Sequence, residues 1–202
     1  AITRRLPDVA TDLLRAAGRR CGMIGTIRYE LGERILPATR TTPDALELQA
    51  MLREMANGRC GCVVMEVSSH ALSQHRVGGI LFDVAIFTNL TGDHLDYHGT
   101  MEAYFESKAR LLQQLKPDGA LVVNLDDPWG RRLRERAGDR RVITYALEQA
   151  ADVTARNLRT GPEGSHFQLV TPWGEGEAFL PLLGDFNVSN GLAAVAACGA
   201  RG

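Results

Sequence analysis

Short apolar runs that alternate with helical patterns constrain the fold of this chain more than any other feature of its sequence. Runs of strand length lie at residues 61–67, 82–88, 119–124 and 141–145, with amphipathic helical patterns between them. β-branched runs of this length are typical of strands buried in a parallel sheet. The alternation therefore predicts an α/β fold, in which a mostly parallel sheet has helices on both faces.

The pattern changes after Gln149. Three stretches of alternating polar and apolar residues, 152–158, 166–171 and 177–182, are separated by turns rich in glycine and proline. They predict a small antiparallel meander added to the sheet.

The bulk composition limits the classes of function. The 202 residues carry a net charge of −1, which argues against broad binding to nucleic acid or membrane surfaces. No apolar run reaches the ~20 residues of a membrane span, and the first residues lack the apolar core of a signal peptide. We therefore expect a cytoplasmic protein with no nucleic-acid partner and no membrane insertion. The four cysteines lack zinc-ribbon spacing, so we expect reduced, buried thiols.

Metal-ligand side chains follow two of the predicted strands. In open parallel sheets, ligands bind beyond the carboxyl ends of the strands, so two neighbouring strands that end this way predict one shared site. Carboxylates suit Mg²⁺, which also binds substrate phosphates, whereas the histidines leave Mn²⁺ or a second Mg²⁺ open. Ordinary hydrogen bonding would also explain any single histidine. The candidate ligands are Glu66, Asp93, His94, Asp96 and His98.

Lys108 is the least ordinary residue of the helical pattern that follows Thr100. It lies in an apolar stripe with Tyr104, Phe105 and Leu111. A lysine that points inward is unfavourable unless it reaches solvent, is paired or is chemically changed.

Thr41 and Thr42 precede another predicted helix, with Thr42 expected as its N-cap and Pro43 at its first position. The two hydroxyls and the free N–H groups would form a cup for an anionic or polar ligand. From capping alone, a well-capped helix with no ligand is the favoured explanation.

Two hydrolytic alternatives lack their motifs. A zinc hydrolase would need a His-Glu-x-x-His helix, which the sequence does not contain. A serine nucleophile at Ser68 or Ser69 would need a Gly-x-Ser-x-Gly elbow, which is also missing.

A series of motifs occurs in a fixed order along the chain. They are Thr41-Thr-Pro43, Met65-Glu-Val-Ser-Ser-His-Ala-Leu72, Gln74-His-Arg76, Thr88-Asn-Leu90, Asp93-His-Leu-Asp-Tyr-His-Gly99, Lys108-Ala-Arg110, Asn124-Leu-Asp-Asp-Pro128 and Phe186-Asn-Val-Ser-Asn190. Together they resemble the central domain of the Mur ligase family, specifically its UDP-N-acetylmuramoyl-tripeptide synthetase (MurE) branch. The resemblance runs from about Arg20 to the last residue.

The resemblance implies an ATP-dependent ligase of peptidoglycan synthesis that uses Mg²⁺. In that family ATP phosphorylates the D-Glu carboxylate of UDP-MurNAc-L-Ala-D-Glu, and the amine of a diamino acid displaces the phosphate. By the same resemblance, Glu66 and His94 bind metal, and Lys108 is carbamylated by CO₂ and faces the metals. The muropeptide-binding positions match Thr41, Thr42, Ser68, Gln74 and Arg76. The pair of positions near the nucleotide base matches Asn187 and Asn190, and Asn124 and Asp127 are further candidates for nucleotide binding.

The chain departs from the family at the phosphate loop. The family has Gly-Thr-x-Gly-Lys-Thr between its first strand and first helix, whereas here Ile2-Thr3 is followed by Arg-Arg-Leu-Pro-Asp, and no Gly-Lys-Thr occurs in the 202 residues. Arg4 and Arg5 would supply charge but not the geometry of that loop.

We therefore expect residues 1–202 to form a truncated central domain, without the family's N-terminal UDP-binding and C-terminal domains, and with little ligase activity by itself. One alternative is a catalytically inactive fragment or muropeptide-binding module. Another is a folylpolyglutamate synthase-like ligase, against which the Thr-Thr-Pro and Ser-Ser-His-x-Leu-x-Gln-x-Arg runs argue.

Overall fold

The computed structural model describes residues 6–201, which form two compact units. Among the described residues, the first unit comprises Leu6, Leu81–Asp93 and 115–201. The second unit comprises Pro7–Ile80 and His94–Gln114. The expectations for Ile2, Thr3, Arg4 and Arg5 lie outside the described residues.

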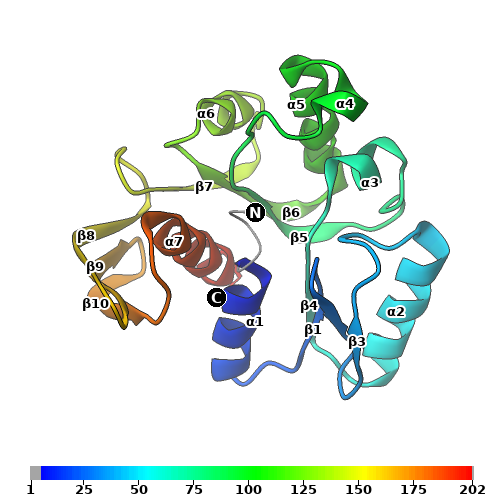
Figure 1. Cartoon of the computed structure of the whole chain (residues 1–202), viewed down its shortest axis with the longest axis horizontal. Coiled ribbons are helices and arrows are strands. Elements are labelled where there is room, and N and C mark those ends of the chain that lie inside the picture. Colours follow the sequence, from blue (N-terminus) through cyan, green and yellow to red (C-terminus); the bar gives the residue numbers. More distant parts are fainter. Residues whose placement is uncertain (1–5, 202) are drawn as a thin grey trace. The chain divides into compact units, whose positions relative to one another are not determined.

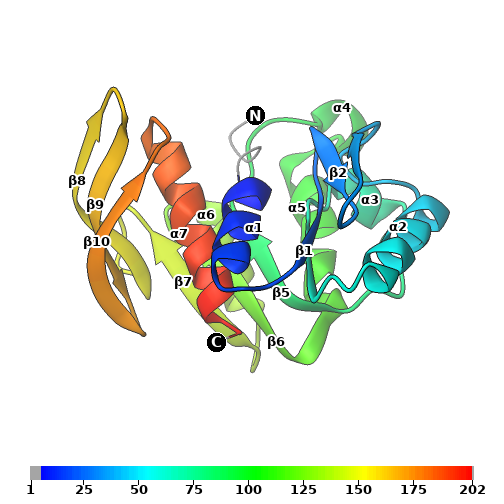
Figure 2. The same cartoon turned by 90° about the horizontal axis from the view of Figure 1, so that it is seen from below.

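The first unit is built on a six-stranded sheet with the order β10-β9-β8-β7-β6-β5. Strands β5 to β8 pair in parallel, and β8, β9 and β10 pair antiparallel. Figure 2 shows β8, β9 and β10 side by side as a separate antiparallel part of the sheet. Both the parallel sheet and the added meander are therefore confirmed. The strands are β5 (Phe82–Phe87), β6 (Leu115–Asn124), β7 (Arg141–Ala146), β8 (Val153–Gly161), β9 (Gly164–Thr171) and β10 (Gly174–Leu180).

Helices α6 (Pro128–Glu135) and α7 (Asp185–Gly199) lie on opposite sides of β7 (Figure 1). Val188 and Leu192 of α7 are fully buried against Val122 and Tyr145 of the sheet. Small alanines follow them along α7, so the helix can pack closely on the strands. The predicted helices on both faces are confirmed for this unit.

The second unit has its own four-stranded sheet, with the order β3-β2-β1-β4. Strands β1 and β4 are parallel, whereas β2 and β3 form an antiparallel hairpin beside β1. The strands are β1 (Cys21–Ile24), β2 (Arg28–Glu30), β3 (Ile35–Pro37) and β4 (Cys62–Met65). The helices are α1 (Leu6–Ala16), α2 (Ala45–Asn57), α3 (Ser69–Ser73), α4 (Leu95–His98) and α5 (Met101–Ala109), which continues as the 3₁₀ helix η1 (Arg110–Gln114).

The prediction that the strands before Glu66 and Asp93 are neighbours in one sheet is wrong. Among residues 6–201, β4 is at the edge of the four-stranded sheet, and β5 is at the edge of the six-stranded sheet. The residues of β4 are half-buried or exposed, with Val63 37% exposed. An apolar run of four residues does not distinguish a central strand from an edge strand, because its length and composition are the same in both.

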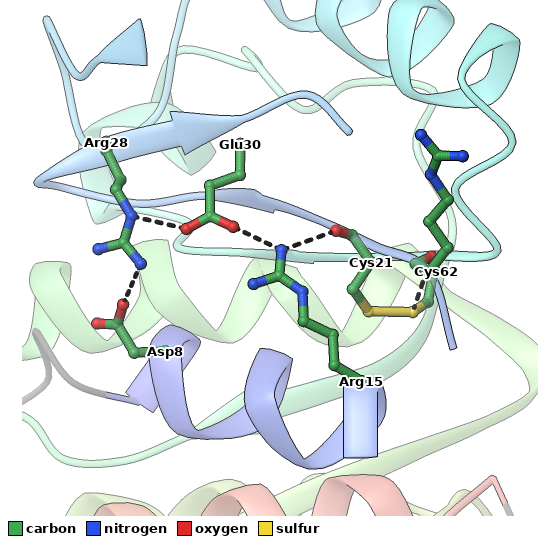
Figure 3. Close-up of polar contacts among 7 residues, drawn as sticks. Asp8, Arg15, Cys21, Arg28, Glu30 and Cys62 are labelled. Atoms are coloured by element: carbon green, nitrogen blue, oxygen red, sulfur yellow. Dashed lines mark hydrogen bonds and ion pairs between the residues drawn. A yellow bond between two sulfur atoms is a disulfide. The ribbon is translucent and has the colours of Figure 1, made fainter. Parts of the chain in front are cut away.

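The expectation of reduced thiols is wrong for two of the four cysteines. Cys21 and Cys62 are directly opposite each other on β1 and β4, with Cα atoms 4.9 Å apart, and a disulfide joins them (Figure 3). Cys60 and Cys198 are free. The pairing depends on the register of two strands far apart in the sequence, so cysteine spacing gave no sign of it.

Ion pairs link α1 to β2 within the second unit (Figure 3). Glu30 is 5% exposed and accepts hydrogen bonds from Arg15, at 2.5 Å, and from Arg28, at 2.6 Å. Arg28 also pairs with Asp8 of α1 at 2.9 Å. Burial would raise the pKa of Glu30, but the hydrogen bonds and charges of the two arginines outweigh it and lower that pKa.

No helix within residues 6–201 is long and apolar enough to cross a membrane.

Candidate functional site

Thr42 joins two of the other predicted site residues in the second unit. Its hydroxyl donates a 2.9 Å hydrogen bond to the carbonyl oxygen of Glu66 and accepts a 3.0 Å bond from the N–H of Ser68. The side chain is 1% exposed. This hydroxyl therefore fixes the backbone where the chain leaves β4 and enters α3.

The prediction that Thr42 is the N-cap of the following helix is wrong, and Pro43 is not its first residue. Asp44 is the N-cap of α2, and its carboxylate accepts from the N–H groups of Leu46 and Glu47. The cup of free N–H groups is thus partly filled by the chain's own carboxylate. Local capping rules did not separate Thr42 from Asp44, because both are good caps.

Arg76 and Gln74 complete this group of polar residues. Arg76 donates from Nη1 to the carbonyl oxygen of Thr42 at 3.0 Å. Its Nε and Nη2 both donate to Gln74 Oε1, at 2.9 and 2.6 Å. Ser68 caps α3 by accepting from Ala71 N–H at 3.2 Å. The structure therefore brings Thr42, Glu66, Ser68, Gln74 and Arg76 into one connected set, which we call the Thr42 cluster.

Glu66 lies at the end of β4 and is held from the end of β1. Its Oε2 accepts a 2.9 Å hydrogen bond from the N–H of Thr26 and a second, short one from the Thr26 hydroxyl. The Thr26 hydroxyl is also 3.1 Å from that of Thr41. The sequence did not single out Thr26, because no motif or periodicity marks a lone threonine after a strand.

His94 and Lys108 meet around the ring of Tyr104. The His94 ring stands edge-on to Tyr104, with centroids 5.9 Å apart. The Lys108 amine lies 5.5 Å from the centroid of the same ring. Lys108 is half-buried while its neighbours Glu106 and Arg110 are exposed, as its place in the apolar stripe predicts. The prediction that Glu66 joins these two residues around one pocket stays a prediction.

Three histidines lie close together beside that ring. The His70 ring is 5.2 Å from that of His94 and 5.6 Å from that of His98, centroid to centroid. Partial burial and the neighbouring imidazoles lower the pKa of His70 and of His98. Asp93 and Asp96, the remaining candidate ligands, are exposed, and Asp93 belongs to the other unit.

The donor set fits Mg²⁺ only as a site that substrate completes. Within residues 6–201, no group of three or more histidine, cysteine, aspartate or glutamate side chains is placed to hold a metal ion. Mg²⁺ is usually held by one or two carboxylates, with waters and substrate phosphates in its other positions. By their chemistry the carboxylate of Glu66, the imidazole of His94 and a carbamate on Lys108 would suit that arrangement, and their meeting at one ion stays a prediction.

The predicted nucleotide-binding residues all lie in the first unit. Asn187 and Asn190, at the start of α7, are 6% and 3% exposed. The Nδ2 of Asn187 donates to Leu183 O at 2.7 Å, whereas its Oδ1 has no hydrogen-bond partner within the described part of the chain. A buried acceptor without a partner is unfavourable, so it fits a ligand that donates a hydrogen bond, such as the amino group of a purine.

Asn124 and Asp127 have structural roles in the same unit. Asn124 accepts from Asp126 N–H at 2.9 Å, and Asp127 caps α6 by accepting from Trp129 and Gly130 N–H. The other carboxylate oxygen of Asp127 accepts from Leu90 N–H at 3.3 Å. These bonds explain both residues without a ligand, and their role in nucleotide binding stays a prediction.

The comparison with known proteins identifies the family of this chain. The family model described as Mur ligase middle domain matches residues 8–198. A UDP-N-acetylmuramoyl-L-alanyl-D-glutamate–2,6-diaminopimelate ligase of Geobacter sulfurreducens is 48% identical over 191 residues, which are 92% of this chain and 37% of that protein. The chain thus spans less than half the length of the curated relatives it matches.

Solved structures of other proteins have the same fold as this chain. A structure of UDP-N-acetylmuramoyl-L-alanyl-D-glutamate–2,6-diaminopimelate ligase has a TM-score of 0.87 and 36% identity, covering 100% of this chain and 42% of that one. A mutant of L. casei FPGS has a TM-score of 0.64 at 17% identity, covering 98% of this chain and 55% of that one, and shares the fold alone.

The fold is the α/β domain found in a solved 2,6-diaminopimelate ligase and, more distantly, in its structural neighbours. Within that class the match is specific, because it extends over nearly the whole sequence. The chain belongs to the Mur ligase middle-domain family.

Proposed function

We propose that this chain is the central domain of a MurE-type ligase that adds a diamino acid to UDP-MurNAc-L-Ala-D-Glu in the cytoplasm, using ATP and Mg²⁺. The observation that supports it most is the Thr42 cluster, in which hydrogen bonds of one buried hydroxyl and one guanidinium join the backbone of Glu66 and Ser68 to Gln74 and Arg76. The 48% identity to a diaminopimelate ligase supports the choice of this branch over a folylpolyglutamate synthase.

Arg76 is the residue of this cluster best suited to bind an anionic substrate group. Gln74 and the carbonyl oxygen of Thr42 hold its guanidinium from two sides, so its direction is set before any ligand arrives. A guanidinium can bind a carboxylate or phosphate through two parallel hydrogen bonds. We infer that Arg76, with the hydroxyl of Ser68, orients the muropeptide.

Glu66, His94 and a carbamate on Lys108 are the groups that would hold Mg²⁺. Bound there, the ion would neutralise charge that develops on the transferred phosphoryl group. Carbamylation replaces the cation of Lys108 by an anion, which would turn a repulsive group into a ligand. Asn187 and Asn190 would bind the nucleotide base.

Calorimetry on this chain tests the proposed substrate. We expect UDP-MurNAc-L-Ala-D-Glu to bind and UDP-MurNAc-L-Ala to bind more weakly, because the latter lacks the D-Glu carboxylate. Arg76→Lys should weaken binding of the first ligand about tenfold or more, since charged hydrogen bonds are worth about 1.5–3 kcal/mol. Arg53→Lys, an exposed change on α2, is the control. Equal binding of the two ligands, or no binding, would contradict the proposal.

We also expect binding without turnover. The Gly-Lys-Thr of a phosphate loop does not occur in these 202 residues. Phosphate release that depends on both muropeptide and diamino acid would contradict this expectation and would favour an active enzyme over a binding module.

A further inference from the structure

One aromatic ring lies at the centre of the side chains around His94. Tyr104, 6% exposed, contacts His94 edge-on at 5.9 Å and lies 5.5 Å from the Lys108 amine. The ring of His98 stacks on it at 4.9 Å, with an interplanar angle of 12°. Tyr104 and Lys108 are one helical turn apart on α5, so their side chains lie on the same face.

His98 is itself held from a different helix. Its Nε2 is 2.9 Å from the hydroxyl of Ser69, the first residue of α3. Ser69 is 2% exposed, and its carbonyl oxygen accepts a 2.9 Å hydrogen bond from the Ser107 hydroxyl of α5. Ser69 of α3 therefore contacts both His98, which stacks on Tyr104, and α5, the helix that contains Tyr104.

The backbone around His94 gives its side chain little support. His94 has a φ of 62°, in the left-handed region, and it makes no side-chain cap to α4, which has only four residues. Non-glycine residues in this region are uncommon and cluster at functional sites. The residue is exposed, and its ring stands edge-on to the rings of Tyr104 and His70.

We propose that Tyr104 is a positioning residue that sets the His94 ring and the Lys108 side chain relative to each other, with His98 and Ser69 holding Tyr104 in place. This role rests on the proposed function, in which His94 and Lys108 serve a metal. Residues that orient metal ligands typically change metal affinity 10–100-fold when they are lost.

Three variants separate the parts of this arrangement. Tyr104→Leu removes the ring, Tyr104→Phe restores a ring of the same shape, and His98→Ala removes the stacking partner while Tyr104 remains. Gln113→Ala, an exposed change beyond α5, is the matched control. The probe is Mn²⁺, and its affinity for the chain with bicarbonate present is measured by electron paramagnetic resonance.

We expect Tyr104→Leu and His98→Ala to weaken Mn²⁺ binding at least tenfold, and Tyr104→Phe to recover most of it. In the metal-free chain, nuclear Overhauser contacts between the His94 and Tyr104 rings should be present in the wild type and weakened in His98→Ala. Melting temperatures of the same samples show whether the variants remain folded. If the Tyr104→Leu chain is unfolded, the His98→Ala chain provides the test.

The outcomes distinguish this inference from the function on which it rests. Wild-type and His98→Ala chains that bind Mn²⁺ equally would overturn the positioning role and leave the proposed metal site intact. A wild-type chain that binds no Mn²⁺ would contradict the metal site and the positioning role together. Weaker binding in His98→Ala with the ring contacts unchanged would also overturn the role, because the effect would then not pass through Tyr104.

Discussion

Thr26 and Glu66, which are 40 residues apart in the sequence, are joined twice: the backbone N–H and the hydroxyl of Thr26 both donate to the same carboxylate oxygen. Thr26 follows β1 and Glu66 follows β4, so the parallel pairing of these two strands brings the residues together. The bonds set the direction of a carboxylate that we assign to metal binding.

Thr26→Val removes the hydroxyl and keeps the size of the side chain. We expect it to lower the free energy of unfolding by about 1–3 kcal/mol, because a hydrogen bond to a charged group is lost. Mn²⁺ affinity should fall as well, since Glu66 would no longer be fixed. Urea denaturation and Mn²⁺ titration measure the two effects.

Thr41→Val is the matched comparison for Thr26→Val. The Thr41 hydroxyl contacts the Thr26 hydroxyl at 3.1 Å, a bond between neutral groups, so its loss should have the smaller effect, about 0.5–1.5 kcal/mol. Equal effects of the two substitutions would contradict the special role of Thr26.

Thr42→Val removes the hydroxyl that pairs with two partly buried backbone groups, the N–H of Ser68 and the carbonyl oxygen of Glu66. We expect a loss of about 2–3 kcal/mol in the free energy of unfolding, since each unsatisfied group is unfavourable. Thr42→Ser keeps the hydroxyl and should recover most of this loss. A Thr42→Val chain within about 0.5 kcal/mol of wild type in urea denaturation would show that the Thr42 cluster does not hold this backbone.

The disulfide between Cys21 and Cys62 should make the chain more stable when it is purified without reductant than after reduction. It closes a loop with a sequence separation of 41, for which loop entropy predicts about 4 kcal/mol relative to the reduced chain. Thiol titration of the unfolded chain should find the two free cysteines, Cys60 and Cys198, before reduction and all four afterwards. Reduction should lower the urea midpoint.

Cys198→Ser separates this effect from a general effect of thiols. Its sulfur is not in the disulfide, so reduction should destabilise the Cys198→Ser chain as much as the wild type. Four reactive thiols in chain that has never been reduced would contradict the pairing.

Glu30 should make the second unit sensitive to acid. Burial opposes its charge, but Arg15 and Arg28 lower its pKa below the ordinary value of 4.5, so the folded chain binds this proton less readily than the unfolded chain. The resulting stabilisation is complete above pH 4.5. It is lost as the pH falls through the pKa that Glu30 has in the folded chain, which lies below 4.5.

Glu30→Gln should therefore be less stable than wild type at neutral pH and should lose less stability on acidification. Urea denaturation at a series of pH values measures this difference. Glu33→Gln is the control, because the Glu33 side chain is 90% exposed in its pair with Arg20. Parallel pH curves for wild type and Glu30→Gln would show that the ion pairs do not act as described.

Local pattern predicted much of this structure from the sequence. The alternation of apolar runs predicted the parallel strands, and polar–apolar alternation after Gln149 predicted the meander. The place of Lys108 in an apolar stripe predicted that its side chain points inward, and the residue is half-buried, with its amine 5.5 Å from the centroid of the Tyr104 ring. Each of these depends on residues within a few positions of one another, where helix and strand periods decide the side-chain direction.

Features that depend on contacts between distant residues could not be predicted from the sequence. The division into two sheets, the disulfide and the bonds from Thr26 to Glu66 all follow from pairings such as that of β1 with β4. Thr42 was assigned to a local cap because its true partners, Glu66 and Ser68, lie 24 and 26 residues away. No local rule contains that information.

In the proposed function, Glu66, His94 and Lys108 serve a single metal. Titrating Mn²⁺ into ¹⁵N-labelled chain, with bicarbonate present, tests it directly, because the ion broadens the signals of nearby residues. We expect the amide signals of Thr26 and Lys108 to broaden together at the same low Mn²⁺ concentration, and to stay sharp in Glu66→Gln. Broadening of only one of these signals, or of both equally in Glu66→Gln, would contradict the shared site.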